Sequence, residues 1–137
     1  MPAIRRLLET ALYCERLDVT TEFFRILLGA EPLLATERIS AFDAGAATVL
    51  LLFQRGQSLH QAAVPGGALT PHDGSGPTHM AFAIDREELG AWEARLAELG
   101  IEVESTVRWE RGGVSLYFRD PDNHSIELAT PGVWATY

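Results

Sequence analysis

The chain has 137 residues, 47% of them hydrophobic and 22% charged, and its eleven basic and nineteen acidic residues give a net charge of −8. This composition is typical of a soluble globular domain with a sizeable core. The acidic balance would repel a phosphate backbone, so nucleic acid is not an expected partner. No apolar run is long enough to span a bilayer, no secretory signal opens the chain, and the single cysteine suits a reducing compartment. We therefore expect a cytoplasmic protein with no membrane contact.

The first half of the chain predicts one strand, one helix and three further strands. Residues 8–14 alternate in polarity, which places Glu9 and Tyr13 on the face opposite the apolar row. A helix is expected over residues 18–29, because an apolar stripe runs along it and Gly29 suits a left-handed end. Three extended runs follow, at residues 32–36, 38–44 and 47–54.

Residues 55–77 are rich in glycine and proline and have no regular hydrophobic period. A connector of this length is usually functional or disordered, so it is a candidate cover for a pocket. His60 and His72 lie within it. Each is either an exposed polar residue or a general base that the connector carries over the site.

The second half repeats this order of elements. A strand opens at His79, a helix follows from Asp85 to Gly100, and three strands are expected at residues 101–109, 114–119 and 124–129. The interval from the first candidate ligand to the helix-ending glycine is nearly the same in both halves. This order indicates a duplicated module.

The last strand follows a tight turn, Asp120-Pro121-Asp122-Asn123, and places Glu127 on the face opposite its apolar side chains. Glu9 and His79 have the same kind of position in their own strands. If the two sheets face one another, these three side chains point into the space between them. An imidazole and two carboxylates suit a divalent metal, although exposed residues or a metal-free hydrogen-bonded group would fit the same pattern.

These residues resemble the vicinal oxygen chelate superfamily, which includes glyoxalase I, bleomycin-resistance proteins, fosfomycin-resistance enzymes and extradiol dioxygenases. The resemblance is carried by the stretches 9–13, 79–82 and, above all, 115–128. It implies an α+β fold in which two βαβββ modules form an eight-stranded open cup. The implied organisation is a single domain over residues 1–137, with module one at 5–54, the connector at 55–77, module two at 78–130 and a tail at 131–137.

The resemblance also implies a metal site. His79 matches the family's opening-strand histidine and Glu127 its closing-strand carboxylate, whereas Glu9 stands where many members carry a histidine. The implied ion is Mn²⁺, Fe²⁺, Zn²⁺ or Mg²⁺, acting as a Lewis acid. Residues 49–53 contain no acid to serve as the fourth ligand of glyoxalase I proteins. Glu127 and Tyr117 are the expected catalytic residues, although Tyr117 also fits a packing role with its hydroxyl at the rim.

Two functions are expected from this resemblance. The first is a homodimeric, metal-dependent enzyme that acts on a small oxygen-rich substrate as a lyase or isomerase, as a dioxygenase or by group transfer. The alternative is a protein of the bleomycin-resistance type, which sequesters a cationic drug without chemistry; the net charge of −8 is compatible with it.

Overall fold

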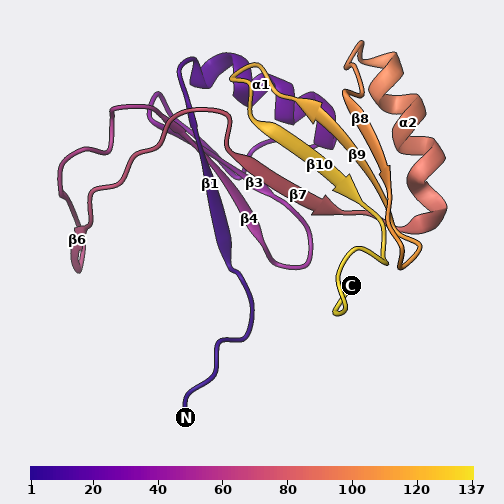
Figure 1. Cartoon of the computed structure of the whole chain (residues 1–137). Helices are drawn as coiled ribbons and strands as arrows, with labels where there is room; N and C mark the ends of the chain where they lie inside the picture. Colours follow the sequence, from indigo (N-terminus) through magenta and orange to yellow (C-terminus); the bar gives the residue numbers. More distant parts are fainter. The chain divides into compact units, whose positions relative to one another are not determined.

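The computed structural model describes residues 1–137, and the chain divides into two compact units, Met1–Ser75 and Gly76–Tyr137. The first unit contains β1 (Glu9–Cys14), α1 (Leu17–Leu28), β2 (Leu34–Ala35), β3 (Ile39–Asp43), β4 (Val49–Gln54), β5 (Ala62–Val64) and β6 (Gly67–Leu69). The second contains β7 (His79–Ala83), a short 3₁₀ turn at Arg86–Glu88, α2 (Leu89–Glu98), β8 (Ser105–Arg108), β9 (Val114–Arg119) and β10 (Ser125–Ala129) (Figure 1).

Each unit is built around one four-stranded sheet, and the two sheets have the same strand order. The orders are β1-β4-β3-β2 and β7-β10-β9-β8. In each sheet the opening strand pairs in parallel with the closing strand, and the remaining pairs are antiparallel. With one helix after each opening strand, the chain contains two βαβββ arrangements, which confirms the predicted α+β class.

The core of the first unit lies between α1 and one face of its sheet (Figure 1). Phe24 and Leu27 of α1 are buried, as are Leu50 and Leu52 of β4. Alternation along β4 therefore turns every second side chain away from α1. The helix ends at Gly29, which has the left-handed conformation (φ 63°) that this residue adopts without strain.

The core of the second unit combines Leu96 of α2 with the apolar rows of β9 and β10. The buried side chains of these rows are those of Leu116, Phe118, Ile126 and Leu128. Since alternate residues face opposite sides of a strand, Ser115, Tyr117 and Glu127 share the other face.

A buried turn fixes the start of β10. The carboxylate of Asp120 accepts the backbone N–H of His124 at 2.8 Å, and its second oxygen lies 2.6 Å from the Nδ1 atom of His124. Both side chains are buried. This turn therefore positions the strand that carries Glu127.

Two regions differ from the sequence-based expectation. The connector contains a regular hairpin, β5–β6, which has too few residues to show a hydrophobic period. The run predicted at residues 101–109 forms a strand only at β8, because the chain first has to leave the helix through Gly100 (φ 68°).

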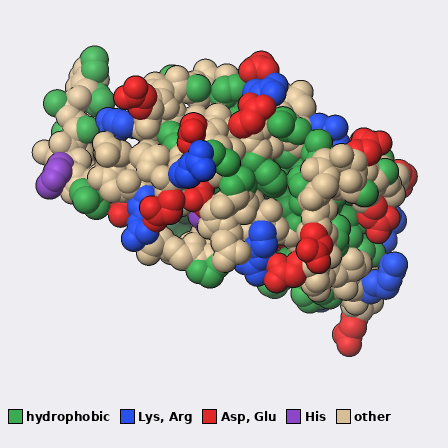
Figure 2. Space-filling model, turned by 90° about the horizontal axis from the view of Figure 1, so that it is seen from above, with side chains coloured by type: hydrophobic (Ala, Val, Ile, Leu, Met, Phe, Trp, Pro, Cys, Tyr) green, Lys and Arg blue, Asp and Glu red, His purple; other side chains and the backbone are tan.

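The final residues of the chain, 131–137, pack on the second unit. The hydroxyl of Tyr137 lies 3.0 Å from the carbonyl of Ile84 and 2.9 Å from that of Ala129, so it closes the ends of β7 and β10. Neither helix has the length and apolarity of a bilayer span. On the face shown in Figure 2, acidic side chains and arginines are interspersed.

Candidate metal and substrate site

His79 and Glu127 meet on the open face of the second sheet. β7 and β10 run in parallel, with His79 opposite Ser125 and Ala81 opposite Glu127. The Nε2 atom of His79 lies 3.2 Å from Oε2 of Glu127, and its Nδ1 atom lies 2.9 Å from the carbonyl oxygen of Ser125. Two predicted ligands are thus brought together by strand register.

The carbonyl of Ser125 fixes the tautomer of His79. A carbonyl only accepts hydrogen bonds, so Nδ1 carries a proton and donates it. In the neutral ring, Nε2 then presents a lone pair toward a carboxylate oxygen. Two facing acceptors repel unless a proton or a metal ion lies between them. This donor set fits a divalent cation, since metal-bound histidines commonly donate their other N–H to a carbonyl.

Glu127 is held in a largely buried position, with 6% of its surface exposed. The Ser115 hydroxyl donates a hydrogen bond to Oε1 of Glu127, and the indole N–H of Trp109 donates to Oγ of Ser115 at 2.8 Å. Ser115 and Trp109 were not predicted as site residues. The sequence could have indicated Ser115, because it lies two residues before Tyr117 and therefore faces the same side of β9.

Tyr117 also lies at this site. Its ring centroid is 6.1 Å from that of His79, and β9 pairs with β10 so that Tyr117 is directly opposite Glu127. Burial, followed by the nearby Glu127 carboxylate, raises the pKa of the Tyr117 phenol. The phenol therefore keeps its proton at neutral pH and can act as a hydrogen-bond donor.

The first unit has a different open face. A cavity of about 230 Å³ is lined by Glu9, Thr10, Ala11, Tyr13, Leu51, Phe53 and His72. Tyr13 and Phe53 stack with centroids 5.7 Å apart, and the ring of His72 meets Phe53 edge to face at 4.5 Å. Glu9 is exposed at the start of β1.

His72, from the connector, packs directly against β1. Its Nδ1 atom lies 2.7 Å from the hydroxyl of Tyr13, and its backbone N–H donates to the carbonyl of Ser58 at 2.9 Å. Gly74 lies so close to Tyr13 that a Cβ atom there would be 2.5 Å from Cδ2 of the ring. Burial and Asp73 raise the pKa of Tyr13. His60, by contrast, is exposed.

No group of three histidine, cysteine, aspartate or glutamate side chains forms a metal-binding cluster within either unit. Within the second unit, His79 and Glu127 form a pair. Glu9 belongs to the first unit, and its role as a ligand remains a prediction. Leu51 of β4 is opposite Ala11 just as Glu127 is opposite Ala81, so the first unit has an apolar residue at the position of the acid.

Known proteins similar to the chain include a metallothiol transferase and a lactoylglutathione lyase. The chain is 32% identical over 119 residues to metallothiol transferase FosB of Bacillus licheniformis, covering 86% of the chain and 70% of that protein. It superimposes on the crystal structure of lactoylglutathione lyase from Agrobacterium tumefaciens with a TM-score of 0.87 and 32% identity, covering 98% of the chain and 99% of that structure.

A third relative contains a metal in its structure. FosX of Listeria monocytogenes, solved as a point mutant with Mn(II) and 1S,2S-dihydroxypropylphosphonic acid, superimposes with a TM-score of 0.64 and 27% identity, covering 92% of the chain and 90% of that structure. The family model for the glyoxalase/bleomycin resistance protein/dioxygenase superfamily matches residues 6–128. This match spans most of the chain, so the chain belongs to the glyoxalase/bleomycin resistance protein/dioxygenase superfamily.

Proposed function

We propose that the protein is a metal-dependent enzyme that acts on a small oxygen-rich substrate, with His79 and Glu127 as ligands of a divalent ion. The observation that carries this proposal is the approach of Nε2 of His79 to Oε2 of Glu127, at 3.2 Å, while Nδ1 is engaged by a carbonyl. The relatives named metallothiol transferase and FosX support a metal-dependent activity.

The residues of the second unit have separable roles in this proposal. When bound, a divalent ion supplies Lewis-acid polarisation of a substrate oxygen. The Ser125 carbonyl orients the His79 ring, and the Ser115 hydroxyl holds one oxygen of Glu127 so that the other faces His79. Tyr117 retains its proton because its pKa is raised, so its phenol donates a hydrogen bond to Glu127 or to a substrate oxygen.

Glu9 is the proposed third ligand. Its support is its position as the first residue of β1, which corresponds to that of His79 as the first residue of β7. A carboxylate there would add a hard oxygen donor, which suits Mn²⁺, Mg²⁺, Fe²⁺ or Zn²⁺. Because many family members are dimeric, we propose a homodimer as the active form.

Elemental analysis of protein purified without chelator tests this assignment. We expect about one divalent ion per chain in the wild type, and a loss of Mn²⁺ affinity of more than about 100-fold in Glu127→Gln, because a ligand contributes more than an outer-shell partner. His79→Gln should behave in the same way. Glu93→Gln and His60→Gln are matched controls at exposed positions and should retain the metal.

The Mn²⁺ affinity of Glu9→Gln tests Glu9 separately from His79 and Glu127. If Glu9→Gln retains wild-type affinity while Glu127→Gln loses it, the third ligand is another group and the assignment of Glu9 is wrong. If the folded wild type binds no divalent ion, or if Glu127→Gln binds Mn²⁺ as tightly as the wild type, the metal-enzyme proposal is wrong. Thermal unfolding of each variant shows whether it is folded.

The second candidate function is sequestration of an organic cation, favoured by the cavity at Glu9. Its lining includes one carboxylate and three aromatic rings but no arginine. Aromatic faces and a carboxylate both attract a cationic ligand. Phenyltrimethylammonium and phenylphosphonate carry the same ring with opposite charge. Preferential binding of the cation by metal-free protein, abolished in Glu9→Gln, would favour this function over the enzyme.

A further inference from the structure

A chain of hydrogen bonds runs from Trp109 through Ser115 to Glu127. The indole N–H can only donate, so Oγ of Ser115 accepts it at 2.8 Å. The proton of the Ser115 hydroxyl is therefore available for Oε1 of Glu127, to which Ser115 donates. Because Ser115 is fully buried, water does not compete for either bond.

We propose that Trp109 and Ser115 are positioning residues, which hold Glu127 as a one-oxygen ligand and make the indole of Trp109 a reporter of metal binding. This inference rests on the proposed metal site. Oε1 is occupied by Ser115 and Oε2 faces His79, so one oxygen remains for an ion. Outer-shell donors of this kind fix the orientation of metal ligands.

The backbone around Trp109 is built to hold the indole in place. Its N–H donates to the carbonyl of Gly113 at 2.9 Å, and Gly112 donates to the carbonyl of Trp109 at 2.9 Å. Gly113 lies against the backbone of Gly132, where a Cβ atom would approach within 2.6 Å. Arg86 bonds the carbonyl of Gly112 at 2.7 Å. The turn is therefore fixed from two sides.

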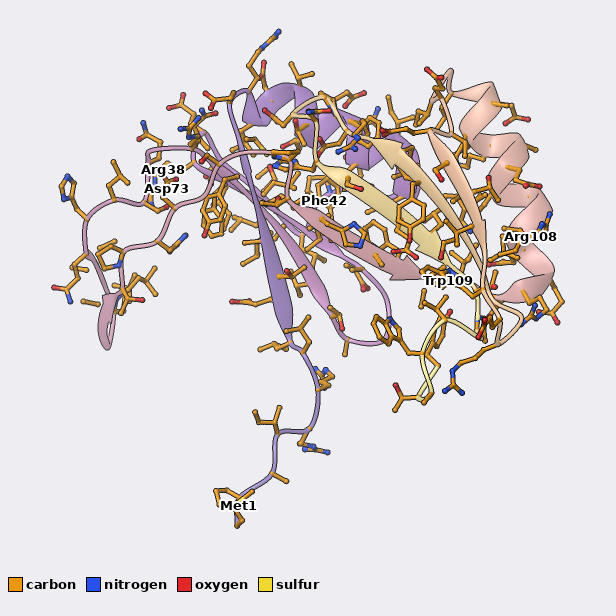
Figure 3. All side chains as sticks on the ribbon, viewed as in Figure 1. Met1, Arg38, Phe42, Asp73, Arg108 and Trp109 are labelled. Carbon is orange, nitrogen blue, oxygen red and sulfur yellow. The ribbon has the colours of Figure 1, made fainter.

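Trp109 links the buried carboxylate to the surface. It is 38% exposed, whereas Glu127 is 6% exposed. In Figure 3, Trp109 lies near the carboxyl ends of β7 and β10, while the neighbouring Arg108 lies toward α2. A change in the charge held by Glu127 therefore reaches an exposed chromophore through two hydrogen bonds.

The one-oxygen arrangement has a consequence for ion choice. Ca²⁺ readily accepts both oxygens of a carboxylate and high coordination numbers, whereas Mg²⁺ requires regular octahedral geometry. With Oε1 bonded to Ser115, the site disfavours two-oxygen binding of Ca²⁺. Removing the Ser115 hydroxyl releases Oε1, so we expect the ratio of Mn²⁺ to Ca²⁺ affinity to fall.

Calorimetric titration with Mn²⁺ and with Ca²⁺ tests the role of Ser115. We expect Ser115→Ala to lose about tenfold or more in Mn²⁺ affinity, as outer-shell substitutions do, and to bind Ca²⁺ with less loss. Ser115→Thr keeps the hydroxyl and should restore both the affinity and the ratio. A purely structural role would lower the thermal midpoint without changing the ratio between the two ions.

Fluorescence of the metal-free protein during Mn²⁺ titration tests the role of Trp109. Tryptophan emission should change at the calorimetric midpoint in the wild type. The same change is expected in the control Trp134→Phe, because Trp134 is 73% exposed. The change should be absent in Trp109→Phe, which also loses the N–H and should bind Mn²⁺ more weakly than the wild type.

The outcomes separate this inference from the proposed function. If the wild type binds no divalent ion by calorimetry, the proposed function fails, and the inference fails with it. If the wild type binds Mn²⁺ but Ser115→Ala and Trp109→Phe match it in affinity, ion ratio and emission change, the positioning role alone is overturned.

Discussion

The two sheets share one architecture and differ in the chemistry of their open faces. Register makes Leu50 of β4 equivalent to Ile126 of β10, and both are buried. The next residues are Leu51 and Glu127, which are also equivalent but chemically opposite. In both closing strands the side chains that face the helix are apolar, whereas the side chains on the open face differ between the two sheets.

The second sheet carries a buried polar network and the first an aromatic cavity. In the second, Ser115 and Glu127 are both buried and bonded to one another. In the first, Tyr13 and Phe53 stack instead. A buried polar group is costly unless it is bonded, and Ser115 supplies such a bond to the acid of the second sheet. The two sheets therefore differ in the hydrogen-bond donor, Ser115, as well as in the acid that it supports.

Phe42 and Phe118 test whether the two cores are equally important. They occupy equivalent positions in β3 and β9, paired with Leu50 and Ile126, and both are fully buried (Figure 3 labels Phe42). Each Phe→Ala substitution should lower the free energy of unfolding by about 3–5 kcal/mol. Urea unfolding followed by circular dichroism measures both. A difference of more than about 2 kcal/mol between them would contradict equivalent cores.

Gly74 tests the contact between the connector and the first sheet. Gly74→Ala should displace the Tyr13 ring, because the added Cβ would be 2.5 Å from it, and should cost about 1–3 kcal/mol. The imidazole resonances of His72 should shift with it in NMR spectra. Gly67→Ala, in open space, is the matched control and should leave those resonances unchanged. Equal spectra for the two variants would argue against the contact.

Tyr117 tests the electrostatic coupling in the second sheet. Its pKa is raised by burial and then by Glu127, so the folded state favours the neutral phenol. The associated stability is present below the usual phenol pKa near 10 and is lost as the pH rises through the raised value. Absorbance at 295 nm should show Tyr117 ionising at lower pH in Glu127→Gln than in wild type. The Tyr117→Phe variant identifies its part of the titration.

The smallest effect is expected from two matched surface ion pairs, one in each unit. Arg25–Glu22 and Arg119–Glu104 are both 2.7 Å long, and the arginine lowers the pKa of each glutamate through its hydrogen bond. Their stabilisation is present at neutral pH and is lost as the pH falls through each lowered pKa. Glu22→Gln and Glu104→Gln should therefore produce small, similar losses in thermal midpoint that disappear in high salt.

Much of the fold was predictable because its signals are local. Alternation identified β1 and β10, extended runs predicted β4 and β9, and the helix-ending Gly29 was recognised from residue type. The β5–β6 hairpin was missed because three-residue strands are too short to show a period. The start of β8 was placed too early, because residues 101–104 alternate between apolar and acidic side chains, as a strand does, and contain no turn motif.

The candidate site was predictable only where strand register decides it. His79 and Glu127 meet because β7 and β10 pair in parallel. The sequence predicted that both side chains lie on the open face, and the family resemblance implied that both are ligands. The contact of His72 with Tyr13 crosses a connector without a period, and no local pattern specifies it. Trp109 was not predicted as a site residue, because its indole N–H reaches Ser115 only through the geometry of the turn.

The carbonyl of Ser125 gives protein engineers an unusual freedom. The ring of His79 is steered by a main-chain atom, so whatever amino acid occupies position 125 supplies the same acceptor. Side chains of different size can therefore be introduced there to alter which molecules approach the imidazole, while the hydrogen bond from Nδ1 to the main chain is kept.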